Sequence, residues 1–370
     1  MKSQIHYRFK LKIRFLIHSL ILFSSFFSFY AQSQINEDTL GKAYTDEIII
    51  KGTAHKEKEI VYENSKYYIL DYNINDEGTF LLVNNLRKYY VYSMDSNMNV
   101  ESQILLSFHP KSLFEDCLGH VHIMSEDSMY QVVKLQNDLV IYDRTSIALY
   151  YTFYRRCIAH NDIGLVFKAY SNLNQSLVYS QTNNVTHQVK TIYSVEDSTL
   201  IRSVRDTRNR IAGMAGGNVM GEVSIDQMKE IRKKEQDINF FNQIVTKPDY
   251  HPLFVLNDTT YIFDHLNEKV VLFSDTISKL ASYPVSYQKS KNWKKEMYLD
   301  KESHNFYAIN QVNGIYIFEL LDLPSSKINK ETAVSKQIFP RKVSVHNGYV
   351  YYLYKEDMEA NLNKLYRYKL

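Results

Sequence analysis

The stretch FEDCLGHVHIMSEDSMYQVV, residues 114–133, contains a tight turn, a β-rich run, a polar turn and a second β-rich run. Aspartate and glycine at a turn between apolar runs are typical of a β-hairpin. Such a hairpin could stand alone or could be one copy of a repeat. A repeat of fixed length would determine the architecture of the whole chain, so self-similarity is the first pattern to test.

The second run of this stretch has six copies along the chain. They are KYYVYSMD, SMYQVVKL, QSLVYSQT, EKVVLFSD, NGIYIFEL and NKLYRYKL, which begin at residues 88, 128, 175, 268, 313 and 363. Apolar residues occupy both faces of these copies, as is typical of a strand that is covered on both sides. Successive copies start 40, 47, 93, 45 and 50 residues apart, so the 93-residue interval contains an insertion.

A predicted hairpin precedes each copy, at residues 69–83, 111–124, 155–170, 252–265, 295–309 and 341–354. Repeat units of about 40–50 residues with four short strands are typical of β-propellers, whose blades bury both faces against their neighbours. We therefore predict that residues 34–370 form one all-β domain, a six-bladed β-propeller whose repeats begin near residue 44, with a small helical insertion at about 195–249. The alternative is a β-sandwich or two smaller β domains.

The two ends of the repeat array are predicted to meet. The chain ends on the third strand of its last unit, which leaves the outer strand of that blade unfilled, and an unpaired sheet edge invites aggregation. The run DEIIIKG, residues 46–52, is strand-like and precedes the first complete unit. We predict that it fills the vacancy and closes the ring.

The repeat resembles the secreted six-bladed β-propeller proteins of bacteria, which are related in shape to NHL-type repeats. The best-matching positions are the turn residues Asp76, Gly78, Asp116, Gly119, Asp162, Gly164, Asn347 and Gly348. The fourth and fifth copies, at Asn257-Asp258 and Asp300, lack the glycine. The resemblance implies a fold, and a fold by itself does not imply an activity.

Residues 1–33 are predicted to be a signal peptide. Five Lys and Arg residues precede a nearly unbroken apolar run from Phe15 to Tyr30, and Ala31 and Ser33 supply the small residues that a signal peptidase reads. Cleavage after Ser33 would leave Gln34 as the first residue of a protein exported to the periplasm, the outer surface or the medium, without a transmembrane anchor. The alternative, a retained anchor, needs about 18 apolar residues, slightly more than this run provides.

The charge balance argues against nucleic acid as a partner. Five of the 44 Lys and Arg residues and none of the 41 Asp and Glu residues lie in the first 33 positions, which leaves 39 basic and 41 acidic residues in the exported chain. A surface that neutralises phosphates would need an excess of basic residues.

The insertion is the segment that breaks the β pattern. Residues 224–245 place five apolar residues on one helical stripe, begin with a Ser224–Gln227 capping box and are followed by Pro248. Four glycines lie between Gly213 and Gly221. A lid or docking arm over one face of the ring and a helical pair packed on the side of the propeller both agree with this pattern.

Histidine and cysteine offer two candidate sites. His120 and His122 alternate on a predicted strand and could offer two imidazoles to a metal, with His109 or His160 as a third, but an outward-facing pair is the favoured interpretation and no metal is predicted. Cys117 and Cys157 are the two cysteines. Repeat alignment places Cys117 at a turn and Cys157 about five residues before the next turn, so we predict separate reduced thiols.

The sequence contains no Gly-rich phosphate loop, zinc-protease helix, nucleophile elbow or EF-hand loop, and no cofactor is predicted. The favoured function is a non-enzymatic binding or scaffold propeller that presents one ring face to a protein or glycan of the cell envelope. The alternative is a glycoside hydrolase or polysaccharide lyase with acids such as Asp76, Asp116, Asp162 and Asp258 in the central channel. These acids recur at matching turns, which favours a structural role, and the catalytic residues stay unknown.

Overall fold

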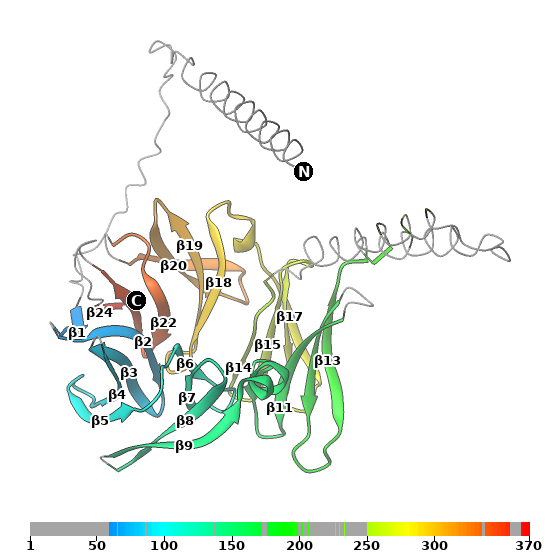
Figure 1. Cartoon of the computed structure of the whole chain (residues 1–370). Coiled ribbons are helices and arrows are strands. Elements are labelled where there is room, and N and C mark those ends of the chain that lie inside the picture. The colour runs from blue at the N-terminus through cyan, green and yellow to red at the C-terminus, as the bar shows by residue number, and fades with distance from the viewer. Residues whose placement is uncertain are drawn as a thin grey trace, which may run out of the picture. The chain divides into compact units, whose positions relative to one another are not determined.

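The computed structural model describes residues 59–64, 66–85, 87–136, 138–171, 176–198, 250–334, 337–355 and 364–370, with isolated positions between 201 and 233. These residues belong to one compact unit, Lys56–Leu370. They form six four-stranded antiparallel sheets, which confirms the predicted six-bladed β-propeller. The inner strands β2, β6, β14, β18 and β22 lie toward the middle of Figure 1, and the outer strands β5, β9, β13 and β17 lie toward its periphery.

Each blade runs from an inner to an outer strand in chain order, except at the ends of the array. Blade 1 contains β2 (Tyr68–Asn75), β3 (Gly78–Asn85), β4 (Lys88–Met94) and β5 (Val100–Leu106). Blade 2 contains β6 (Ser112–Glu115), β7 (Val121–Met124), β8 (Ser128–Leu135) and β9 (Asp138–Ser146). Blade 3 contains β10 (Cys157–His160), β11 (Leu165–Ser171), β12 (Ser176–Thr182) and β13 (Val189–Glu196). Blade 4 contains β14 (Leu253–Leu256), β15 (Thr259–Asp264), β16 (Lys269–Phe273) and β17 (Lys279–Pro284). Blade 5 contains β18 (Trp293–Asp300), β19 (Asn305–Val312), β20 (Ile315–Asp322) and β21 (Lys327–Ala333). Blade 6 contains β22 (Arg341–His346), β23 (Tyr349–Tyr354), β24 (Lys364–Lys369) and β1 (Glu59–Tyr62).

Tight turns between the first and second strands follow from side chains that imitate the backbone. The Oδ1 atoms of Asn75, Asp116 and Asn161 each accept a hydrogen bond from the backbone N–H two residues later, at 2.9–3.2 Å. In blade 4, Asn257 and Asp258 both have positive φ angles, 47° and 58°. Asparagine and aspartate tolerate this conformation, which explains why the fourth copy needs no glycine.

Strand β1 closes the ring. It pairs antiparallel with β24, with Glu59 opposite Arg367 and Ile60 opposite Tyr366. Closure of the last blade by a segment from before the first blade is therefore confirmed, but the segment that fills the outer position is residues 59–62. The predicted segment, residues 46–52, lies outside the described residues, and its assignment to this position was wrong because an apolar run alone does not fix strand register.

Hydrophobic clusters fill most boundaries between blades. Among the described residues, five buried clusters join blades 6 and 1, 1 and 2, 3 and 4, 4 and 5, and 5 and 6. Blade 1 shows why both strand faces are apolar, because the adjacent β3 residues Leu81 and Leu82 are fully buried, Leu81 against blade 6 and Leu82 against blade 2. None of these five clusters joins blade 2 to blade 3.

A short helical connector lies between blades 2 and 3 instead. It consists of α2 (Ile147–Leu149), which Ser146 caps by accepting a hydrogen bond from the Leu149 N–H, and the π-helix η2 (Tyr150–Tyr154). Its sequence, IALYYTFY, has few polar residues and contains no turn signal. This helical connector was not predicted from the sequence.

Three predictions fall on residues that the structure does not describe. They are the signal peptide at residues 1–33, the closing segment at residues 46–52 and nearly all of the insertion at residues 195–249. The insertion falls in the chain between the end of β13 and the start of β14, and its helical structure stays a prediction. Within the described part of the chain, no helix has both the length and the apolar character that crossing a membrane requires.

Candidate functional site

A cavity of about 400 Å³ lies among the inner strands of five blades. It is lined by the β2–β3 turn of blade 1, the β6–β7 turn of blade 2, and the inner strands β10, β14 and β18 of blades 3, 4 and 5: residues 75–77, 115–119, 158–160, 253–255, 297–299 and Lys301. Blades 1 to 3 contribute carboxylates, an amide and an imidazole, whereas blades 4 and 5 contribute mainly apolar side chains. The volume suits a small ligand or one end of a larger one.

Glu115 is a cavity-lining carboxyl group whose pKa is raised. Its Oε2 accepts a hydrogen bond from Asn73 Nδ2 at 2.9 Å. Burial raises the pKa of Glu115 and the neighbouring charge of Asp76 adds to this, while the Asn73 hydrogen bond and the positive charge of Lys301 act in the opposite direction. Glu115 therefore keeps a proton to a higher pH than an exposed glutamate.

Asp116 is bound on both carboxylate oxygens. Its Oδ1 accepts the backbone N–H groups of Leu118 and His120, and its Oδ2 lies 2.9 Å from His122 Nε2 and 3.4 Å from His120 Nδ1. Burial raises the pKa of Asp116, but the hydrogen bonds from His122 and the two backbone groups outweigh burial, so the pKa is lowered overall. Asp116 is an ionised anchor of the turn rather than a proton donor.

The two candidate metal ligands share one carboxylate. His122 lies on β7 and is 4% exposed, and His120 precedes the strand. The favoured interpretation of an outward-facing pair was wrong for His122, because Asp116 provides a buried hydrogen-bond partner. Neither proposed third ligand completes the site, since the His109 ring packs on Tyr89 and His160 Nδ1 contacts the backbone carbonyl oxygen of Cys117. Within the described residues, no group of three His, Cys, Asp or Glu side chains has an arrangement that could hold a metal ion.

Cys117 and Cys157 form a disulfide, which corrects the prediction of separate thiols. Their Cα atoms are 5.6 Å apart. The prediction compared positions along superposed repeats, whereas the two cysteines lie in neighbouring blades, where the start of β10 approaches the β6–β7 turn. The alignment was also displaced by one residue, because Asn161 rather than Asp162 has the turn-forming role of Asp116.

His160 reaches the cavity from the end of β10. Its Nδ1 lies 2.6 Å from the backbone carbonyl oxygen of Cys117. A carbonyl can only accept a hydrogen bond, so Nδ1 carries the proton, and in the neutral imidazole Nε2 remains as an acceptor. The side chain is exposed and lines the cavity. His160 can therefore accept a hydrogen bond from a bound molecule.

The four acids of the enzyme hypothesis do not converge. Asp76 and Asp116 line the cavity, but Asp162 and Asp258 are exposed at the β10–β11 and β14–β15 turns and are not among its lining residues. Sequence reasoning missed Glu115, His160 and Lys301 as cavity residues. Each of these three residues lies beside the first turn of its repeat. Aligning the six repeats on this turn, rather than on the third strand, would have identified them as cavity residues.

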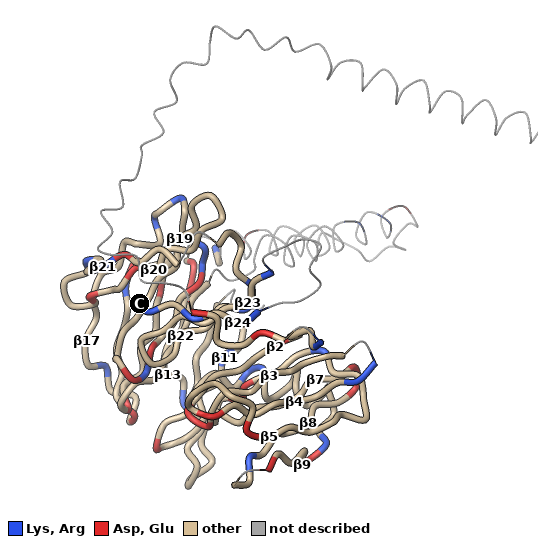
Figure 2. The backbone as a smooth tube through the Cα atoms, turned by 90° about the vertical axis from the view of Figure 1, so that its left-hand side faces the viewer, with Lys and Arg blue, Asp and Glu red and all other residues tan. Residues whose placement is uncertain are grey.

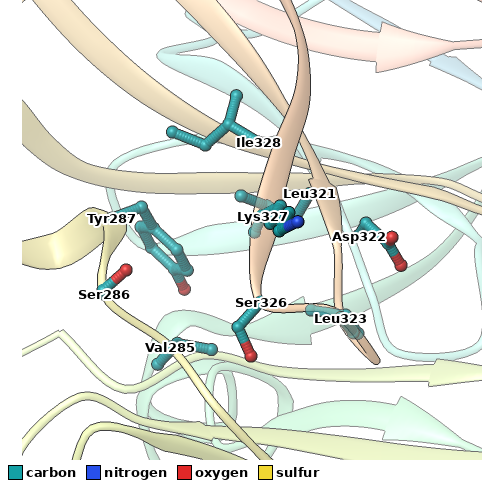
Figure 3. Close-up of a pocket in the computed structure, with 9 residues that line it drawn as sticks. All are labelled: Val285, Ser286, Tyr287, Leu321, Asp322, Leu323, Ser326, Lys327 and Ile328. Carbon is teal, nitrogen blue, oxygen red and sulfur yellow. The ribbon is translucent and has the colours of Figure 1, made fainter.

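A second, smaller pocket lies between blades 4 and 5. Figure 3 shows it between the segment of Val285, Ser286 and Tyr287 and the β20–β21 turn. Its volume is about 20 Å³, which is room for about one water molecule. It is too small to be a ligand site.

Acidic and basic residues are interspersed over the strands and turns (Figure 2). The view shows no large face of one sign of charge. The absence of nucleic acid among the partners stays a prediction.

Comparisons with known proteins give distant structural similarity. No family model matches the sequence, and no curated protein matches it. Among solved structures, a luciferin-regenerating enzyme is 10% identical, with a TM-score of 0.34 over 84% of this chain and 94% of that one. The calcium-binding protein regucalcin from Agrobacterium tumefaciens is 8% identical, with a TM-score of 0.34 over 84% and 92%. Virginiamycin B lyase from Staphylococcus aureus is 8% identical, with a TM-score of 0.31 over 85% and 98%.

Proposed function

We propose that this protein is a non-enzymatic binding propeller, exported to the cell envelope, that takes one or two sugar units of an envelope glycan into its central cavity. The observation that carries the proposal is the cavity of about 400 Å³, which is built from the inner strands of five blades. Pockets of roughly 300–1,000 Å³ with a few convergent polar groups are typical of small-ligand sites.

The lining suits a molecule that has hydroxyl groups along its edge and C–H groups on its face. Asp76, Glu115 and His160 offer acceptors on one side, and Lys301 offers a donor. Phe254 and Tyr298 line the opposite side, from blades 4 and 5. Burial raises the pKa of Tyr298, so its hydroxyl stays neutral and can serve as donor or acceptor.

Two features support export. The first is the basic segment followed by an apolar run in residues 1–33. The second is the Cys117–Cys157 disulfide, because disulfides persist in oxidising compartments such as the periplasm and the extracellular space.

Binding is favoured over catalysis because the four recurring acids do not form one catalytic set. Asp116 is held by Leu118, His120 and His122, and Asp162 and Asp258 lie outside the cavity. The competing function, a glycoside hydrolase or polysaccharide lyase, is favoured by one observation. Glu115 has a raised pKa beside the charge of Asp76, and a carboxyl group of raised pKa next to a second carboxyl group is what such enzymes use.

A matched pair of turn variants tests saccharide binding. Asp76 and Asp258 are both exposed residues of first-turn segments, but only Asp76 lines the cavity. Calorimetric titration with a panel of neutral and acidic oligosaccharides should find a binder, and Asp76→Asn should weaken its binding by about tenfold, equivalent to about 1.4 kcal/mol. Asp258→Asn should leave the affinity unchanged.

The same panel separates binding from catalysis. Oligosaccharides recovered after prolonged incubation should have their original mass. Shortened or unsaturated products that disappear with Glu115→Gln would establish the enzyme instead. Equal weakening by Asp76→Asn and Asp258→Asn, or capture of an envelope protein alone with no oligosaccharide bound, would refute the saccharide proposal.

A further inference from the structure

The boundary between blades 2 and 3 differs from the other five. Among the described residues, each of the other boundaries contains a buried hydrophobic cluster. Such clusters supply the greater part of the free energy that holds blades together. The boundary between blades 2 and 3 must therefore be held by other contacts.

Aromatic side chains of the connector supply part of these contacts. The Tyr150 ring packs on Phe114 of blade 2 at 5.0 Å, and the Phe153 ring packs on Phe167 of blade 3 at 5.4 Å between centroids. Phe153 is 41% exposed. Because water reaches this contact, it stabilises the boundary less than a buried cluster would.

Two further links cross the same boundary. The Cys117–Cys157 disulfide joins the β6–β7 turn of blade 2 to the first residue of β10 in blade 3. His160, at the other end of β10, donates its Nδ1–H to the Cys117 carbonyl oxygen. Cys117 and His160 both line the cavity. The disulfide therefore fixes the position of Cys117, whose carbonyl oxygen accepts the hydrogen bond that orients His160.

We infer that the Cys117–Cys157 disulfide is a redox-sensitive clasp, which closes the ring between blades 2 and 3 and keeps His160 oriented in the cavity. Reduction loosens this boundary and releases His160 from the Cys117 carbonyl. The consequence for ligand affinity rests on the proposed saccharide-binding function, whereas the loosening of the boundary does not.

The reductant is a dithiol, and the exchange is balanced. A thiolate of the dithiol attacks one sulfur, the bond between the two cysteine sulfurs breaks, and a mixed disulfide forms. The second thiol of the reductant then displaces the protein, so the reductant becomes a cyclic disulfide and both cysteines become thiols. Cys117 is partly exposed and lines the cavity, which gives the dithiol a route, whereas Cys157 is 5% exposed.

Reduction of the folded protein tests the clasp without a change in sequence. The chain has two cysteines in total, so a dithiol can act on this bond alone. Hydrogen exchange followed by mass spectrometry should show exchange at least tenfold faster after reduction in peptides covering β6–β7 and β10–β11. Peptides from the boundary of blades 5 and 6, which a buried cluster closes, should be unchanged.

Nitrogen NMR of histidine-labelled protein tests the orientation of His160. The signals that His160→Asn removes should indicate a protonated Nδ1 in the oxidised protein, and reduction should shift them toward values for a solvent-exposed imidazole. A Cys117→Ser, Cys157→Ser double variant should reproduce both results if it folds. Because neither measurement needs a ligand, failure of saccharide binding would refute the proposed function alone.

Two outcomes would overturn the inference. One is unchanged exchange across blades 2 and 3 in protein whose reduction is verified by thiol labelling. The other is faster exchange in all six blades to the same degree, which would show that the disulfide stabilises the whole domain rather than this boundary.

Discussion

Replacing Glu319 by glutamine is expected to stabilise the protein at and above neutral pH. Glu319 lies on β20, is 6% exposed and accepts a hydrogen bond from Asn310 through Oε1. Its Oε2 has no hydrogen-bond partner among the described residues. Burial raises the pKa of Glu319 to about 7, the charge of Glu331 adds to this, and the Asn310 hydrogen bond opposes it.

The size of this stabilisation follows from the difference in proton binding by residue 319 between the folded and the unfolded protein. Between pH 4.5, the ordinary value, and pH 7, folded Glu319 holds a proton that the unfolded chain has released. The free energy of unfolding therefore falls as pH rises through this interval. At about 1.4 kcal/mol per pH unit the loss reaches about 3 kcal/mol. Glutamine has no proton to lose, so the variant should avoid this loss.

Thermal unfolding of both proteins, followed by circular dichroism from about pH 4 to about pH 8, measures the effect. The midpoints should coincide near pH 4, and near pH 8 Glu319→Gln should melt about 5 °C higher, given the entropy of unfolding typical of a domain of this size. Glu331→Gln, which also removes one negative charge but from an exposed position on β21, should raise the midpoint near pH 8 by less. A difference between Glu319→Gln and the natural protein that does not change with pH would refute the reasoning.

Two other regions give tests of their own. Deletion of residues 59–62 removes the outer strand of blade 6 and its pairing with β24, so the thermal midpoint should fall or the protein should aggregate through the exposed edge; an unchanged melt would mean that β1 does not close the ring. N-terminal sequencing of protein recovered from the envelope or medium should begin near Gln34, and a retained Met1 would disprove signal cleavage.

The strands and the repeat could be predicted from the sequence. The segment SMYQVVKL coincides with β8, Ser128–Leu135, and NKLYRYKL contains β24, Lys364–Lys369. These predictions succeeded because a strand covered on both faces has a local apolar pattern, and because Asn, Asp and Gly mark the turns between strands. The exported location and the saccharide ligand stay predictions.

Contacts between blades were decided by the tertiary structure. The disulfide, the closing strand β1, and the meeting of Glu115 with His160 around one cavity all depend on how neighbouring blades are placed. Cys117 and Cys157 are separated by 40 residues, which indicates a neighbouring repeat but not whether a turn of one blade reaches the inner strand of the next. Local periodicity fixes which faces of a strand are buried, whereas the stagger between sheets arises from packing of side chains that are distant in the sequence.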